Sequence, residues 1–194
     1  MAIKRASIAI AAAGALALGV ASSAVVMAAA APRFSSASAK QVQVQPKAGT
    51  CHARGSGLYE LPASRCTPGL RNPAVTPRTI RSTICVSGWT AKVRPSESIT
   101  NKEKRASMAA YGDKASTSRY EYDHLIPLEL GGAVNAAGNL WPEPDYTTHS
   151  GFYLNPKDHL ENALKHLVCS GKMPLLTAQE LIATNWVTAY HTYG

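Results

Sequence analysis

The sequence predicts an α+β domain stabilised by disulfides. Two short segments rich in aromatic and aliphatic residues begin near Arg119 and Asn139, flank a Gly-Gly turn and are predicted to be strands. Two segments nearer the C-terminus repeat their apolar residues with the 3.6-residue period of an amphipathic helix. The four cysteines suit two disulfides. Residues 51–194 have the size of one domain, so we expect no second one.

The N-terminal residues have the composition of a secretory signal. Two basic residues precede an almost uncharged run of Ala, Ile, Leu and Val, which ends in several small-residue cleavage motifs. We expect a signal peptide over residues 1–30, cleaved after Ala29 or Ala30, and a secreted chain that is released or retained at the cell envelope. The alternative is an uncleaved anchor, because the run approaches the roughly 20 residues of a membrane-spanning helix. Residues 31–50 are predicted to be a disordered linker.

The cysteines favour disulfides over a metal site. Four cysteines allow three pairings, and the sequence alone does not choose among them. We favour Cys51 with Cys66, which closes a short loop, and Cys85 with Cys169, which ties the N-terminal part to the last helices. A zinc site is the alternative, but the sequence has no C-x-x-C or paired Cys/His spacing.

The middle of the chain predicts turns followed by a helix. Residues 66–94 combine Pro and Gly with β-branched residues, which indicates turns and one or two short strands between Ile84 and Val93. Residues 96–112 begin with Ser and Thr as capping candidates, continue through helix-forming residues and end at Gly112, which predicts a helix.

The C-terminal part predicts two further helices. The first runs from Pro156 to about Cys169, with proline in its first turn and Gly171 beyond its end. The last begins with Thr177 as its N-cap and Glu180 at the capping-box position.

The predicted order of strand, strand and helix carries a recognisable motif. Asp123-His124-Leu-Ile-Pro127, then Gly131-Gly132, then Asn139-Leu140 resembles the HNH family of nucleases with the ββα-metal (His-Me finger) fold. Roughly residues 66–190 also resemble small secreted actinobacterial HNH-like proteins, through CTPG at 66–69, TIC at 83–85, GWT at 88–90, NLWPEP at 139–144 and KDHLEN at 157–162. The resemblance implies a ββα core over about 119–170, with additional helices and short strands around it. It also implies metal-dependent endonuclease activity.

Phosphodiester hydrolysis needs an activated water and stabilisation of charge on the phosphate and the leaving oxygen. His124 is the expected general base, because an imidazole can accept a proton near neutral pH. Asn139 is expected to orient His124 by accepting its other ring N–H. The resemblance makes Asp123 a metal ligand, although consecutive strand residues point to opposite faces, so a local bend is required. The expected cofactor is one divalent ion, Mg²⁺ before Mn²⁺ or Zn²⁺.

The third ligand departs from the family pattern, which has His or Asn in the helix. Asp158 is the favoured candidate, because it lies in the first helical turn, has Glu161 on the same face and suits a hard cation. His149, Asn155 and Asn162 remain alternatives.

The formal net charge of +8 suits a polyanion such as nucleic acid, and it equally suits an anionic cell envelope. Arg119, Lys157 and the basic cluster 102–105 are candidates for phosphate contacts, and no recognition helix is evident, so we expect little sequence specificity. Trp141 is expected to be a core residue. We expect a monomer that hydrolyses DNA, with RNA as an alternative substrate. We expect no stable membrane association, and the sequence identifies no immunity partner. The alternative is a non-catalytic secreted or envelope binding protein on the same scaffold.

Overall fold

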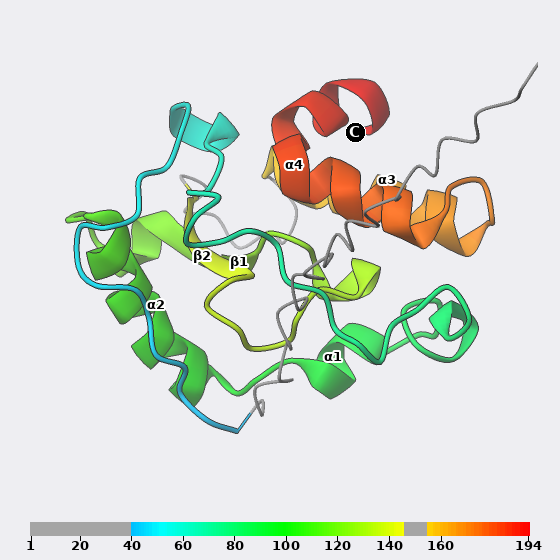
Figure 1. Ribbon diagram of the computed structural model, residues 1–194, viewed down its shortest axis with the longest axis horizontal. Helices are drawn as coiled ribbons and strands as arrows, with labels where there is room; N and C mark the ends of the chain where they lie inside the picture. The colour runs from blue at the N-terminus through cyan, green and yellow to red at the C-terminus, as the bar shows by residue number, and fades with distance from the viewer. Residues whose placement is uncertain (1–39, 146–154) are drawn as a thin grey trace, which may run out of the picture. The chain divides into compact units, whose positions relative to one another are not determined.

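The computed structural model describes residues 40–145 and 155–194, which lie within one compact unit, Phe34–Gly194 (Figure 1). These residues form the predicted α+β fold. The predicted signal peptide and His149 lie outside them. The α-helices and strands are α1 (Trp89–Val93), α2 (Glu97–Tyr111), β1 (Tyr120–His124), β2 (Leu140–Pro144), α3 (Pro156–Cys169) and α4 (Leu175–Tyr193). The short 3-10 helices are η1 (Gly57–Tyr59), η2 (Ile80–Ser82), η3 (Thr117–Arg119) and η4 (Leu128–Leu130).

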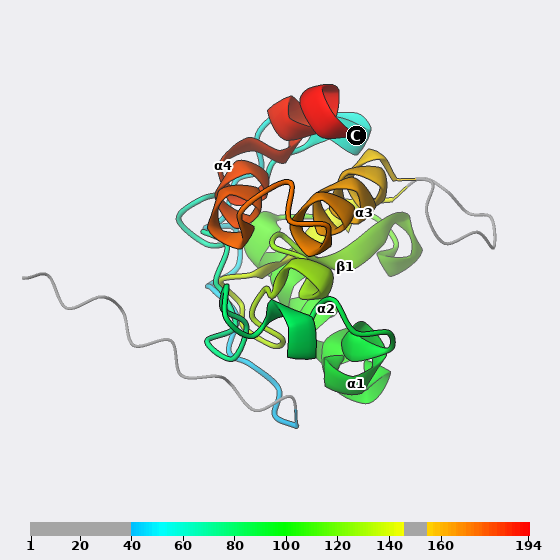
Figure 2. The ribbon, with the colours of Figure 1, turned by 90° about the vertical axis from the view of Figure 1, so that its right-hand side faces the viewer.

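The two strands form an antiparallel pair in which Asp123 lies opposite Trp141 and His124 lies opposite Leu140. Because side chains alternate along a strand, Asp123 shares one face of the sheet with Trp141, and His124 shares the other with Tyr122. The sheet lies between α2 on one side and α3 with α4 on the other, as Figures 1 and 2 show from two directions. The strands therefore carry Asp123 and His124 on opposite faces of the sheet.

Helices α2 and α3 begin and end close to where the sequence predicts. Gly112 ends α2 in the left-handed conformation (φ 78°), which glycine adopts without a Cβ clash. Asn155 caps α3, since its side-chain oxygen accepts a hydrogen bond from the Lys157 N–H, and Pro156 occupies the first turn. These local signals are sufficient to place both helices.

The start of α4 differs from the prediction. The helix begins at Leu175, directly after Pro174, and Pro174 as the N-cap makes no side-chain cap hydrogen bond. Thr177 therefore lies inside the first turn, because proline already fixes the backbone where the helix starts. Asn185 has non-helical angles (φ −161°, ψ 89°) and divides α4 at a kink.

Two further predictions of local structure are wrong. Residues 66–94 form η2, α1 and turns instead of strands, because Thr79 and Thr83 hydroxyls bond nearby carbonyls and stabilise tight turns. Residues 40–50, assigned to a disordered linker, are held against α2 by backbone hydrogen bonds from Gly49 to the Ala109 carbonyl at 2.9 Å and from Cys51 to the Ala110 carbonyl at 3.0 Å.

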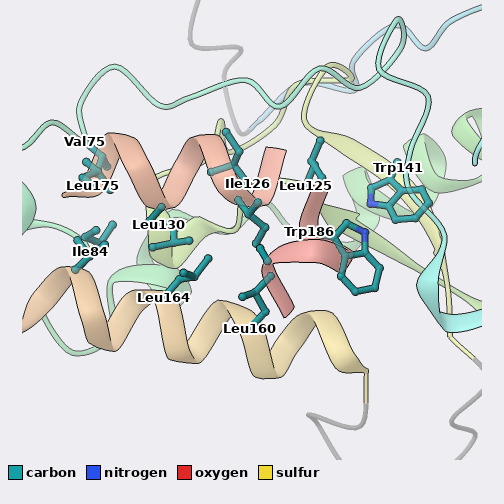
Figure 3. Packing of buried hydrophobic residues seen from close by; sticks show 14 residues of the cluster. Val75, Ile84, Leu125, Ile126, Leu130, Trp141, Leu160, Leu164, Leu175 and Trp186 are labelled. Carbon is teal, nitrogen blue, oxygen red and sulfur yellow. The ribbon is translucent and has the colours of Figure 1, made fainter. Parts of the chain in front are cut away.

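The hydrophobic core joins the loop after β1 to α3 and α4 (Figure 3). Its members are aliphatic and aromatic side chains from distant parts of the sequence, and Trp141 is fully buried among them as expected. The largest include Ile84, Leu125, Ile126, Leu130, Trp141, Leu160, Leu164, Ile182 and Trp186.

Both expected disulfides are present, Cys51–Cys66 and Cys85–Cys169. The second joins the segment after η2 to the end of α3 across 84 residues of sequence. Within the described ranges, no helix is both long and apolar enough to cross a membrane.

Candidate functional site

The centre of the candidate site is a buried ion pair between β1 and α3. The Lys157 ammonium lies 2.7 Å from Asp123 Oδ2 and donates a hydrogen bond of 2.9 Å to the His124 carbonyl. It also contacts the carboxylate of Glu161, one helical turn further along α3. The Trp141 indole N–H donates to the same Asp123 oxygen at 3.3 Å. These contacts fix the start of α3 against the end of β1.

The burial of Lys157 corrects its predicted role in phosphate binding. Its side chain has no exposed surface, because the first turn of α3 packs directly on β1. Burial by itself lowers the pKa of an ammonium, but the charges of Asp123, Glu161 and Glu143 outweigh this and raise the pKa of Lys157 well above its usual value. Lys157 is therefore a permanent internal cation that is closed off from substrate.

Further carboxyl groups surround this ammonium. Glu143 on β2 is 2% exposed, and within residues 40–145 and 155–194 its Oε1 has no hydrogen-bond partner. Burial and the charge of Asp123 raise the pKa of Glu143 well above its usual value, and burial does the same for Glu161. One ammonium thus faces several carboxyl groups, which titrate together and not independently.

Two carboxyl groups at the edge of the cluster bear on the expected metal. Glu121 is exposed as a residue, but its carboxyl group is largely desolvated. This desolvation, together with the charges of Asp123 and Asp158, raises the pKa of Glu121 to about 7. Burial and the charge of Asp123 also raise the pKa of Asp158. Carboxylates that repel one another in this way are oxygen donors suited to a hard cation.

The donor chemistry at Asp123 and Asp158 fits Mg²⁺, which usually keeps several waters and takes one or two protein carboxylates. In residues 40–145 and 155–194, no group of three or more His, Cys, Asp or Glu side chains is arranged to hold a metal ion. Asp123 Oδ2 is already engaged by Lys157 and by Trp141. A metal ion at this site would therefore depend on few protein ligands and on water.

His124 is held in one orientation on the opposite face of β1. Its Nε2 lies 2.9 Å from the carbonyl oxygen of Val134. A carbonyl only accepts hydrogen bonds, so Nε2 carries the proton and Nδ1 carries the lone pair. Burial lowers the pKa of His124 to about 4, and the hydrogen bond to Val134 only partly opposes this effect. The ring is therefore a neutral imidazole at physiological pH.

Asn139 does not have its expected partner. Its Nδ2 donates to the carbonyls of Ile126 at 2.9 Å and Ala133 at 3.1 Å, and its Oδ1 accepts from the Ile126 N–H at 3.0 Å. The bond to the His124 ring that the sequence suggested is made by the Val134 carbonyl instead. Asn139 is fully buried and closes the loop between the strands. It positions His124 through the backbone.

The remaining predicted residues differ in their distance from this centre. Arg119 is exposed in η3, immediately before β1 and at the opposite end of the strand from Asp123. Asp158 is half-buried in the first turn of α3. Asn155 serves as the helix cap, and Asn162 donates to the Asp158 carbonyl. Lys104, in the basic cluster 102–105, is electrostatically coupled to Glu121.

Sequence reasoning missed two groups. Glu143 lies opposite Glu121 in the strand register, so alternation along 139–144 would have placed it on the face of Asp123. The Val134 carbonyl carries no side-chain signal that could have identified it.

Comparisons of the chain with protein-family models, with curated proteins and with solved structures give no match.

Proposed function

We propose that this protein is a secreted endonuclease of the ββα-metal type, which hydrolyses phosphodiester bonds of DNA, and RNA as an option, with little sequence specificity. The observation that carries the proposal is the neutral His124 imidazole, which directly follows Asp123 in sequence and lies on the opposite face of a strand that pairs with β2 and contacts α3. The order of strand, strand and helix supports a ββα core. The basic composition supports a nucleic-acid substrate, and the two disulfides support an extracellular location.

The base chemistry follows from the tautomer of His124. Nδ1 removes a proton from a water molecule, the resulting hydroxide attacks phosphorus, and the bond from phosphorus to the leaving oxygen breaks. The Nε2–H bond to Val134 keeps the ring in place while Nδ1 becomes protonated. The leaving oxygen takes its proton from solvent.

Asp123 and Asp158 would hold one divalent cation, with Mg²⁺ favoured over Mn²⁺ or Zn²⁺. Such an ion, when bound, supplies Lewis-acid stabilisation of the charge on the phosphate and on the leaving oxygen. Lys157 holds Asp123 through the ion pair at the centre of the carboxyl cluster and so limits its motion. Arg119, exposed just before the start of β1, stays the proposed phosphate contact.

A non-catalytic binding protein on the same scaffold is the second candidate. It is favoured by the ammonium of Lys157 on Asp123 and by the low exposure of the His124 side chain, since only 6% of the residue is accessible. In this case His124 and Asp123 would serve stability alone, and surface charge would provide the binding.

Cleavage of plasmid and single-stranded DNA by the mature protein separates these functions. The protein is assayed with Mg²⁺, Mn²⁺ or Zn²⁺ and with EDTA, beside His124→Ala and Asp123→Asn. The exposed His166 on α3 provides a matched control, His166→Ala. We expect cleavage that EDTA and both site variants abolish and the control retains. Absence of cleavage with every metal, from folded protein with intact disulfides, would favour the binding protein.

A further inference from the structure

The segment 41–45 is attached to α2 by a buried carboxylate. Glu103 on α2 has no exposed surface, and its Oε1 accepts hydrogen bonds from the Gln43 N–H at 2.6 Å and from Asn135 Nδ2 at 3.1 Å. Asn135 Nδ2 also donates to the Gln41 carbonyl at 2.8 Å. Three distant parts of the sequence therefore meet at one carboxylate.

Asn135, one end of this hydrogen-bond network, is the sequence neighbour of the residue whose carbonyl orients the His124 ring. Asn135 directly follows Val134, whose carbonyl accepts the hydrogen bond from His124 Nε2. Asn135 is 1% exposed and bonds only through its Nδ2 in the described contacts, so its position depends on Glu103 and on the Gln41 carbonyl. A shift of Asn135 moves the adjacent peptide group, and the ring of His124 moves with it.

A second contact reaches the same face of β1. The side chain of Gln45 donates from Nε2 to the Tyr122 hydroxyl at 3.0 Å. Tyr122 precedes His124 by two residues, so both side chains lie on one face of the strand. The segment 41–45 therefore contacts the strand that carries His124 and also the loop that orients its ring.

The network is buried and polar, and such networks favour one fixed geometry. A buried carboxylate in a helix is costly unless its hydrogen bonds are satisfied, and Glu103 Oε2 has no hydrogen-bond partner among the described residues. A polar network of this kind fixes one geometry of the groups that it joins, which a hydrophobic contact does less strictly.

We propose that Glu103, Asn135 and the segment 41–45 position the His124 ring for catalysis. The proposal rests on the proposed function, in which His124 is the general base. Glu103 touches neither substrate nor metal and acts through the Val134 carbonyl. The N-terminal segment of the domain is thereby part of the catalytic apparatus.

The test removes hydrogen bonds of the network by substitutions in the full mature chain. Glu103→Ala removes the acceptor, and Glu103→Gln keeps an oxygen acceptor. Gln43→Pro removes the N–H that bonds Glu103, together with the Gln43 side chain that donates to the Gln41 carbonyl. Val44→Pro, at an exposed neighbour, is its control, because the Val44 N–H makes no bond to Glu103. Each variant is examined for its melting temperature, for kcat and KM in plasmid cleavage with Mg²⁺, and for the His124 tautomer by long-range ¹H–¹⁵N NMR without metal.

We expect Glu103→Ala and Gln43→Pro to lower kcat by about tenfold or more with little change in KM, because small displacements of a catalytic group have large effects on rate. The Nε2–H signature of His124 weakens in both, and it persists in Glu103→Gln and Val44→Pro. Full kcat and an unchanged tautomer in a folded Gln43→Pro protein would overturn the proposal. If the unmodified protein cleaves no DNA, the proposed function fails, while the NMR signature still decides whether the network orients the ring.

Discussion

Replacement of Lys157 by methionine tests whether the buried ammonium holds the site together. Methionine has similar length and no charge, so Lys157→Met leaves Asp123 and Glu161 without their counter-ion in a region that solvent does not reach. Removing one partner of a buried ion pair typically costs about 3–5 kcal/mol. The backbone contact to the His124 carbonyl is lost as well. We expect the free energy of unfolding to fall by about 4 kcal/mol at pH 7.

The assay is equilibrium unfolding in urea with the disulfides intact, supported by thermal unfolding. For a chain of this size, the loss corresponds to a decrease in melting temperature of about 8–16 °C. The penalty should shrink as the pH falls, because carboxyl groups that lack a counter-ion accept protons and lose their charge. The double variant Lys157→Met/Asp123→Asn should recover part of the loss.

Lys165→Met is the control on the same helix. Lys165 forms a partly exposed pair with Glu129 at 3.3 Å, and such pairs contribute about 0–1 kcal/mol. The reasoning is refuted if Lys157→Met costs no more than Lys165→Met, or if its cost is the same at pH 4 as at pH 7. Either result would mean that solvent reaches and stabilises the carboxyl cluster.

Three other predictions concern the loop, the disulfides and pH. Asn139→Ala removes three buried hydrogen bonds and should cost about 2–3 kcal/mol in urea unfolding; a loss below about 0.5 kcal/mol would contradict the role of Asn139 in closing the loop. Loss of the Cys85–Cys169 disulfide, which spans 84 residues, should lower the free energy of unfolding by about 4.5 kcal/mol, and loss of Cys51–Cys66, which spans 15 residues, by about 3 kcal/mol. Urea unfolding of the two double-alanine variants measures both losses. The pKa of His124 is about 4 in the folded protein and lies below the ordinary 6.5, so the unfolded chain binds the proton first. The neutral ring of His124 therefore contributes about 3 kcal/mol to the free energy of unfolding, and this contribution is fully present above pH 6.5 and lost as the pH falls towards 4. An NMR titration that places the pKa of the folded His124 ring near 6.5 would exclude this pH dependence.

Elements with local signals were predictable from the sequence. The first turn of α3 contains Pro156, and its amphipathic period requires no tertiary information. Gly112 marks the end of α2 for the same reason, because the left-handed conformation needed there favours glycine. The favoured disulfide pairing, a short local loop and a link from the N-terminal part to the last helices, is confirmed.

Predictions that depended on tertiary partners were less successful. Lysine is rarely buried, so its position at 157 suggested a surface contact, and only the packing of α3 on β1 encloses it. The amide of Asn139 suits the His124 ring or the backbone equally well, and the loop geometry selects the backbone. Residues 40–50 have no apolar period that could have revealed their packing, because hydrogen bonds of the Gly49 and Gln43 N–H groups hold this segment to α2.

The kink at Asn185 divides the last helix into two cooperative segments. The side chain of Asn185 caps the second segment by accepting from the Thr188 N–H, so this segment has its own N-terminus. Trp186 in that segment donates to the Glu60 carbonyl, inside the loop closed by Cys51–Cys66. The end of the chain is consequently fastened to the first disulfide loop, and reduction of that disulfide should release residues 186–193 to hydrogen exchange before the rest of the domain opens.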